Sequence, residues 1–255
     1  LSALLVFIRF CRTGRFALAA SFVTLFAAGL LSKPSVVTLP VVMLAGLLLL
    51  QIKEYPGNGP WTVIAIVFAM ALAWGTYVVS TEVSYPGILP PWYIRPLLAG
   101  RVIWFYLATL VYPHDLVVIY PRWDVGAHLR EFFVLFVALT AFAAAVVYAW
   151  YRHWIDAITI WGIVFFLVNI LPVSGLAPFG YMGHSFVADH FLYLPFVGLT
   201  VIVARCVDFA LAGLRKYPLG SVISYAGAAI VLAMLAFLSV KQVMLWQDPA
   251  LLWDA

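Results

Sequence analysis

Long uncharged runs of apolar residues dominate the chain. Five of them contain no Asp, Glu, Lys or Arg: Phe16–Ser32, Pro34–Ile52, Tyr55–Thr81, Phe132–Tyr151 and Tyr217–Val240. The hydrocarbon core of a bilayer is about 30 Å thick and a helix rises about 1.5 Å per residue, so a span needs roughly 20 residues. Two shorter runs complete the set, and we predict an all-α fold, a polytopic transmembrane helical bundle.

Clusters of basic residues orient this predicted bundle, because such clusters favour the cytoplasmic side. The clusters are Arg9, Arg12 and Arg15; Lys53; Arg152 with His153; and Arg215 with Lys216. All four lie in the cytoplasm if the chain crosses the bilayer twice between successive clusters. About seven full spans follow from this pattern: Phe16–Leu31, Thr38–Ile52, Pro60–Val79, Phe132–Trp150, Ala157–Pro172, Phe191–Ala210 and Gly220–Val240.

Two further apolar segments do not fit as spans. Leu1–Ile8 is too short, and we interpret it as a partial helix of a module, residues 1–245, that is incomplete at its N-terminus. Pro96–Tyr112 carries Arg101 among aromatic residues and is predicted to be interfacial or re-entrant. The outer side then holds the loops 80–130 and 173–190, and residues 246–255 begin a linker toward C-terminal repeats.

Composition narrows the functional classes. The chain is 66% hydrophobic and 9% charged, and its mean hydropathy is +1.08. Such a chain cannot bury its apolar surface in a water-soluble globule. The net charge of +4 is concentrated in short clusters beside apolar runs, where it fixes topology and contacts lipid headgroups. Nucleic acid is therefore not an expected partner, and the two cysteines show no metal-ligand spacing.

Candidate chemistry is confined to a few polar positions. Lys33, Arg101 and Arg122 are candidates for binding a phosphate, because ammonium and guanidinium groups pair with anionic oxygens. Two of them, Lys33 and Arg122, have a simpler explanation. Lys33 can extend to lipid headgroups, and Arg122 can stack on an aromatic ring to order its loop.

Asp189, His190 and Tyr193 form a second candidate group, within or just after the polar segment 183–190. A carboxylate followed by an imidazole can serve in acid–base chemistry or bind a sugar hydroxyl, although Asp at a helix start is also a common cap. No metal site is predicted from the spacing of the histidines and carboxylates. A divalent cation bridging a substrate pyrophosphate is the alternative, with His114-Asp115 among its ligands.

Three segments in order resemble one family. Leu30-Leu-Ser-Lys-Pro-Ser-Val-Val-Thr-Leu-Pro40, Tyr112-Pro-His-Asp-Leu-Val-Val-Ile-Tyr-Pro-Arg-Trp-Asp124 and Val187-Ala-Asp-His-Phe-Leu-Tyr-Leu-Pro195 resemble the membrane module of bacterial tetratricopeptide-repeat membrane proteins. These are similar to the eukaryotic transmembrane and tetratricopeptide-repeat O-mannosyltransferases, a branch of the GT-C glycosyltransferases. The resemblance covers nearly the whole chain.

The resemblance implies a function and a site. It implies a module of the bacterial inner membrane that binds a polyprenyl-phosphate-linked sugar on the periplasmic face for transfer to a protein or glycan acceptor. The donor-binding residues would be Lys33, Arg101, Arg122, Asp189, His190 and Tyr193. The catalytic carboxylate is expected upstream of residue 1, so this piece alone would be catalytically incomplete.

Two other classes of function are alternatives to the glycosyltransferase. A non-catalytic membrane scaffold or accessory subunit, with other membrane subunits as partners, is the alternative, since fold does not determine function. A transporter is disfavoured, because the chain shows neither paired ionisable residues at mid-membrane depth nor inverted repeats.

Overall fold

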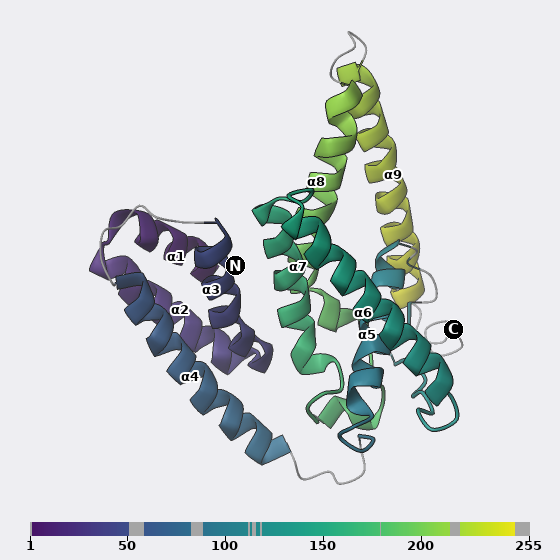
Figure 1. Ribbon diagram of the computed structural model, residues 1–255, viewed down its shortest axis with the longest axis horizontal. Helices are drawn as coiled ribbons and strands as arrows, with labels where there is room; N and C mark the ends of the chain where they lie inside the picture. Colours follow the sequence, from purple (N-terminus) through teal and green to yellow (C-terminus); the bar gives the residue numbers. More distant parts are fainter. Residues whose placement is uncertain are drawn as a thin grey trace.

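The computed structural model describes residues 2–50, 59–82, 89–111, 113, 116–117, 119–178, 180–214 and 220–247, where helices are joined by turns and irregular loops and no strand occurs (Figure 1). The α-helices are α1 (Ser2–Thr13), α2 (Phe16–Ser32), α3 (Leu39–Leu50), α4 (Gly59–Glu82), α5 (Arg95–Val111), α6 (Leu129–Tyr151), α7 (Ala157–Ile170), α8 (Phe196–Leu214) and α9 (Gly220–Gln247). Short 3₁₀ turns are η1 (Pro34–Thr38), η2 (Leu171–Val173), η3 (Gly180–Gly183) and η4 (Asp189–Leu192).

The all-α prediction agrees with this structure, but the prediction of about seven full spans is wrong. Among the described residues, two helices are long and apolar enough to cross a membrane, Gly59–Thr81 and Leu129–Tyr151. Only 22% of the first window and 6% of the second are buried inside the protein. Core helices of soluble proteins are mostly buried, so this exposure points to association with a membrane.

Three of the other predicted spans, those in α2, α3 and α7, form helices that are too short to cross a bilayer. Helix α2 has 17 residues and α3 has 12, which correspond to about 25 Å and about 18 Å at 1.5 Å per residue. Prolines set several of these limits, because proline lacks the N–H that continues a helix. Pro34 follows α2, Pro40 lies in the first turn of α3, and Pro172 follows α7. Helix α8 carries Arg205 and Asp208 in its second half.

Helices α1 to α4 pack around a first apolar core. The Phe7 and Phe22 ring centroids are 5.3 Å apart, and Phe26 stacks 6.3 Å further along α2. Val67 of α4 closes the same core, and all these side chains are buried. The predicted partial helix 1–8 is longer than expected and extends to Thr13. Phe10 and Cys11 lengthen its buried face beyond residue 8.

A second core lies between α5, α6, α7 and α8. It is formed by Leu98, Val102, Tyr106, Phe132, Phe166, Ile170, Met182, Phe186, Val187 and Leu199, among others. Helix α5, predicted to be interfacial or re-entrant, runs beside α6 and under residues 182–188 and is not one of the two candidate spans. Its depth relative to a membrane stays a prediction.

Helices α3 and α7 join the two cores. The indole Nε1 of Trp161 donates to the carbonyl oxygen of Val42 at 3.3 Å, and Gly46 leaves room for that ring. Nearby, the Thr38 hydroxyl donates to Oδ1 of Asn169 at 2.7 Å, and Asn169 Nδ2 donates to the Phe165 carbonyl. Asn169 is only 4% exposed, so these partners satisfy a polar side chain in an apolar setting.

Helices α7 and α8 approach each other at two glycines. A Cβ added at Gly198 would lie 2.4 Å from the Gly162 carbonyl oxygen and 2.7 Å from the Phe166 nitrogen. A Cβ at Gly162 would in turn lie 2.9 Å from the Gly198 carbonyl oxygen. Two helix backbones can approach this closely only where the residues at the crossing are small.

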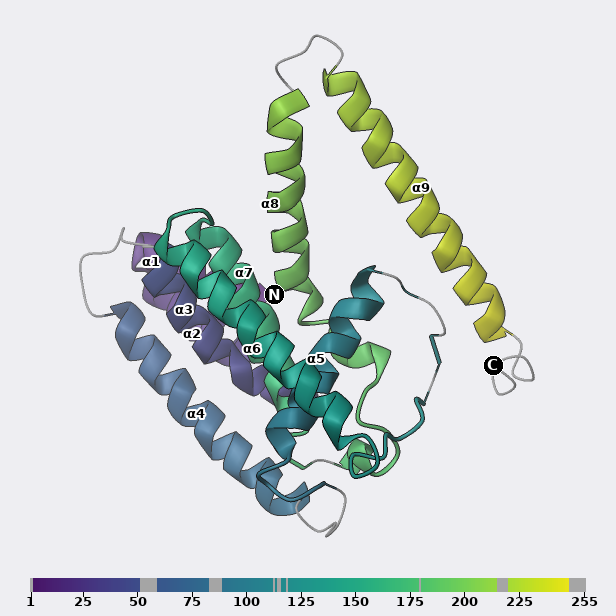
Figure 2. The same cartoon turned by 45° about the vertical axis from the view of Figure 1, so that its right-hand side comes forward.

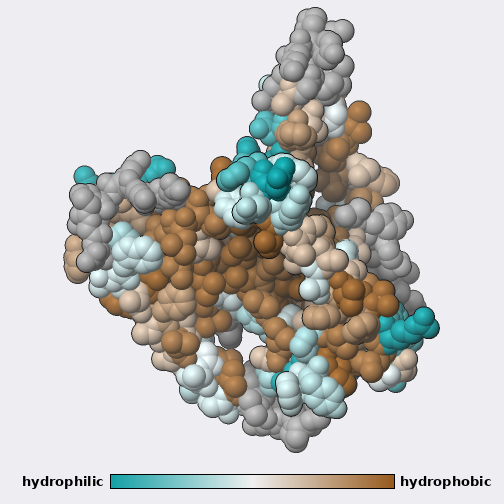
Figure 3. Space-filling view, viewed as in Figure 1, coloured by the Kyte–Doolittle hydropathy of each residue, from teal (hydrophilic) through white to brown (hydrophobic). Residues whose placement is uncertain are grey.

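The loops that carry the candidate residues lie at one end of the molecule. Helix α4 ends and α6 begins there, next to the segment between α7 and α8 (Figures 1 and 2). At the opposite end, exposed Arg9, Arg12 and Arg15 lie around the turn between α1 and α2, and Arg152 follows α6. Figure 3 shows a broad apolar surface with polar patches toward its margins.

Some predicted features fall outside the described residues. They are Lys53, the pair Arg215 and Lys216, the pair His114 and Asp115, and residues 248–255 of the predicted linker.

Candidate functional site

Segment 119–124, which holds Arg122, and the polar segment 183–190 fold against each other, although some sixty residues separate them. The Tyr120 hydroxyl donates a hydrogen bond of 2.8 Å to Oδ1 of Asp189. The Arg122 guanidinium carbon lies 5.0 Å from the centre of the Phe186 ring, and the Trp123 ring lies 6.2 Å from the same ring. Polar and aromatic contacts therefore unite segments 119–124 and 183–190 in one cluster.

Asp189 is held in place by its neighbours in the chain and by α5. The buried Tyr106 hydroxyl donates to the Ala188 carbonyl oxygen and accepts from the Ala188 N–H, both at 3.1 Å. The Ser185 hydroxyl accepts from the Val187 N–H at 3.2 Å. Because Tyr106 belongs to a regular helix, it fixes the backbone immediately before Asp189.

A glycine shapes the other side of this loop. Gly175 has φ of +90°, a conformation that residues with a Cβ rarely adopt. A Cβ there would also lie 2.6 Å from Cδ2 of Leu98. The loop after α7 can therefore lie directly on α5.

Burial and charge change the acidity of the two polar groups. Burial raises the pKa of the Asp189 carboxyl. The hydrogen bond from Tyr120 and the charge of His190 lower this pKa, but by less, so it lies above the usual value. Burial lowers the pKa of His190, and the positive charge of Lys33 lowers it further against the attraction of Asp189. His190 is thus biased toward the neutral imidazole, and Lys33 lies close enough to affect it.

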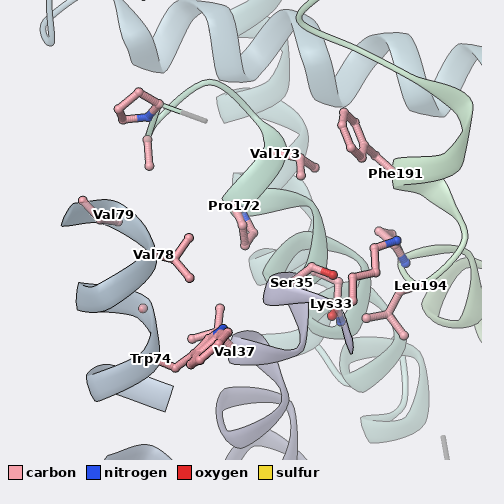
Figure 4. A pocket seen from close by; sticks show the side chains of 15 residues that line it. Lys33, Ser35, Val37, Trp74, Val78, Val79, Pro172, Val173, Phe191 and Leu194 are labelled. Carbon is pink, nitrogen blue, oxygen red and sulfur yellow. The ribbon is translucent and has the colours of Figure 1, made fainter. Parts of the chain in front are cut away.

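Lys33 also lines an apolar cavity of about 260 Å³ (Figure 4). Walls come from the turn after α2, from α4, from the end of α7 and from the loop before α8. The lining residues include Lys33, Ser35, Trp74, Asn169, Phe191 and Leu194. This cavity, called here the Lys33 cavity, places one cation beside a largely hydrocarbon space.

Arg101 and Arg122 line a different hollow, of about 300 Å³, together with Trp123 and Glu131. The Arg101 Nη1 atom lies 3.4 Å from Glu131 Oε1, and its guanidinium carbon lies 5.2 Å from the centre of the Trp123 ring. Both arginines therefore stack on aromatic rings, as the simpler explanation of Arg122 expected. This hollow is called here the Arg101 hollow.

The six predicted site residues therefore do not form one site. Lys33, Asp189 and His190 come together, and Arg101 and Arg122 share the Arg101 hollow. Tyr193 is 73% exposed and lines neither space. In the described part of the chain, no group of three or more His, Cys, Asp or Glu side chains could hold a metal ion.

Sequence reasoning did not single out four residues that matter here. Tyr120 and Tyr106 bind Asp189 and its neighbour, while Ser35 and Trp74 line the Lys33 cavity. Tyr120 lies inside segment 112–124, one of the three segments that carry the family resemblance, which is a usable signal. The other three are ordinary residues of a turn or an apolar helix and carry no distinctive pattern.

Replacing Tyr120 with Phe tests the electrostatics of Asp189. Without its donor, the half-buried carboxylate loses stabilisation, so the pKa of Asp189 rises further. A raised carboxyl pKa means that the native state binds the proton more tightly, so stability falls as pH rises through the range between the unfolded and folded values. We expect Tyr120→Phe to lower the free energy of unfolding by about 1 kcal/mol at pH 8 and by less at pH 5.

Thermal unfolding in a mild detergent at both pH values measures this difference. Tyr93→Phe is the matched control, because Tyr93 is exposed and its ring packs edge-on against Trp92. Equal losses at pH 5 and pH 8 for Tyr120→Phe would argue against a charged Asp189 as the acceptor.

Comparison of the chain with known protein families, with curated proteins and with solved structures found no match. Its function is therefore argued from the residues and contacts above.

Proposed function

We propose that the chain is a membrane glycosyltransferase module that binds a polyprenyl-phosphate-linked sugar at Lys33, Asp189 and His190. The observation that carries this proposal is the hydrogen bond between Tyr120 and Asp189, which brings two distant polar segments together beside a lysine. The resemblance of segments 30–40, 112–124 and 187–195 to the GT-C family supports the same function.

Each residue has a role that follows from its chemistry. The Lys33 ammonium pairs with the donor phosphate, because a charge-assisted hydrogen bond is among the stronger polar contacts. Asp189 and His190 bind sugar hydroxyls, since a carboxylate accepts and a neutral imidazole can both donate and accept. Arg101 and Arg122 stack on Trp123 and Phe186 and are assigned to ordering the loop around the site.

The same proposal includes an orientation in the membrane. Helix α4 ends and helix α6 begins at the end of the molecule that holds the candidate site, so we place the described residues of loops 80–130 and 173–190 on one side. Exposed basic residues lie at the other end, which is the cytoplasmic side under the positive-inside tendency. We place the site on the periplasmic face of a bacterial inner membrane, with a protein or glycan as acceptor.

A non-catalytic membrane scaffold is the second candidate. It is favoured by the contacts of the polar groups themselves: Asp189 binds Tyr120, and Arg101 pairs with Glu131 and stacks on Trp123. Such contacts would equally stabilise a fold that has no substrate. Other membrane subunits would then be its partners.

Donor binding separates the two functions. With the chain in nanodiscs, we expect His190→Gln and Asp189→Asn each to weaken binding of an undecaprenyl-phosphate-linked sugar at least about tenfold, through loss of contacts to the sugar. Binding is measured by microscale thermophoresis over a panel of sugars, and sugar transfer is followed in parallel. His153→Gln, at the opposite end of the molecule, is the control. Unchanged affinity in both site variants would favour the scaffold.

A further inference from the structure

Two polar atoms in the wall of the Lys33 cavity have no hydrogen-bond partner among the described residues. They are the hydroxyl oxygen of Ser35, in η1, and the indole Nε1 of Trp74, in α4. Both atoms are buried from water, where an unsatisfied polar group is unfavourable. A third polar side chain of the same wall, Asn169, accepts a hydrogen bond from Thr38 and donates one to Phe165. The wall therefore offers two unused donors inside an otherwise apolar space.

A second apolar space adjoins this cavity. A groove of about 610 Å³ runs along α4 and α3, lined by Val41, Phe68, Ala71 and Leu72 among others. Val37, Gly75 and Val79 line both the cavity and the groove, so the two spaces share a wall. Two neighbouring apolar spaces thus lie next to a single exposed lysine.

We propose that the Lys33 cavity and the adjoining groove bind one glycerophospholipid, with its phosphate at Lys33, its ester carbonyls at Ser35 and Trp74, and its two acyl chains in the two apolar spaces. The charge of Lys33 complements the phosphate. The ester carbonyl oxygens supply the acceptors that the two donors lack. This site shares Lys33 with the proposed donor site but uses neither Asp189 nor His190, so the two lipids would compete for the same lysine.

A polyprenyl chain suits these spaces less well than a phospholipid does. Between its phosphate and its end it is pure hydrocarbon, so it would leave Ser35 and Trp74 without acceptors. It also has one chain where the protein offers two spaces. The donor lipid and the phospholipid are therefore expected to be distinguishable by competition.

Binding requires a small local change. Because neither donor atom is exposed, Ser35 must rotate about its χ1 bond and the Trp74 indole must tilt before they reach an occupant. Figure 4 shows Lys33 and Ser35 close together and Trp74 coming from α4. The lipid would thereby bridge the turn after α2 and helix α4.

An ester lipid and its ether analogue provide the test. The full chain is stripped of lipid in detergent, and phosphatidylglycerol or a dialkyl ether phosphatidylglycerol of equal chain length is added and counted by native mass spectrometry. We expect the ester lipid to bind about tenfold more tightly, because the ether lipid lacks the carbonyl acceptors. In the double variant S35A and W74F this preference should disappear.

A charge variant and a competitor complete the experiment. Lys33→Gln should weaken both lipids to the same extent, whereas Lys241→Gln on α9 should weaken neither. Equal affinity of the wild-type chain for the ester and ether lipids would overturn the proposal. So would displacement of the ester lipid by an equal concentration of undecaprenyl phosphate, which would assign the cavity to the sugar donor. Sugar binding by His190→Gln is read separately, so the two proposals can fail independently.

Discussion

Replacing Gly198 with Ala is expected to lower the free energy of unfolding by about 3 kcal/mol. The new methyl group would lie 2.4 Å from the Gly162 carbonyl oxygen and 2.7 Å from the Phe166 nitrogen. Both neighbours are backbone atoms, which cannot rotate away as a flexible side chain does. Helices α7 and α8 must therefore separate, and their packing along the crossing is weakened. Denaturation of the purified chain in detergent, followed by tryptophan fluorescence, measures the loss.

Gly227→Ala is the matched control in α9. Nothing lies within 4 Å of a Cβ added at Gly227, so the substitution meets open space. Alanine has the higher helix propensity by about 1 kcal/mol, and this variant should be neutral or stabilising. If both variants changed stability alike, the close crossing of α7 and α8 would not be what Gly198 serves.

Tyr106→Phe is expected to lower stability by about 2 kcal/mol and to weaken donor binding as well. The substitution removes the partner of the buried Ala188 N–H, and an unsatisfied buried donor is costly. The Ala188 carbonyl oxygen keeps a second partner, because the Phe191 N–H donates to it at 3.1 Å. The loss of stability therefore comes mainly from the unpaired N–H of Ala188, the residue before Asp189.

Hydrogen–deuterium exchange locates this effect. In Tyr106→Phe we expect faster exchange in peptides that cover residues 185–192, together with a lower midpoint of thermal unfolding. Tyr193→Phe removes the same hydroxyl from a side chain that is 73% exposed and should change neither quantity. Unaltered exchange around Ala188 would contradict the positioning role of Tyr106.

The apolar pattern predicted the helical class and the two candidate spans correctly. The predicted spans Pro60–Val79 and Phe132–Trp150 lie inside α4 and α6, because these runs contain no charge and no proline beyond the first turn. The count of spans was wrong for a physical reason. An uncharged run such as 34–52 is long enough in sequence, but Pro34 and Pro40 divide it into a 3₁₀ turn and a 12-residue helix.

The candidate site was predictable in part. Polar residues in an apolar chain are candidates for function because burying each of them costs free energy. This criterion selects Lys33, Asp189 and His190, which the structure brings together. Tyr193 follows His190 closely in sequence but is 73% exposed and lines neither space. Ser35 and Trp74 could not be foreseen, because only the packing shows that their polar atoms are buried without partners.

The contact between Gly175 and Leu98 has a consequence for affinity. It rests the loop on α5 through main-chain geometry, and the hydrogen bonds of Ala188 hold the far end of the same loop. A loop already ordered in the unbound protein loses little conformational entropy when a ligand arrives. For a ligand that binds at this end of the molecule, little of the favourable free energy of its contacts is therefore offset by ordering the loop.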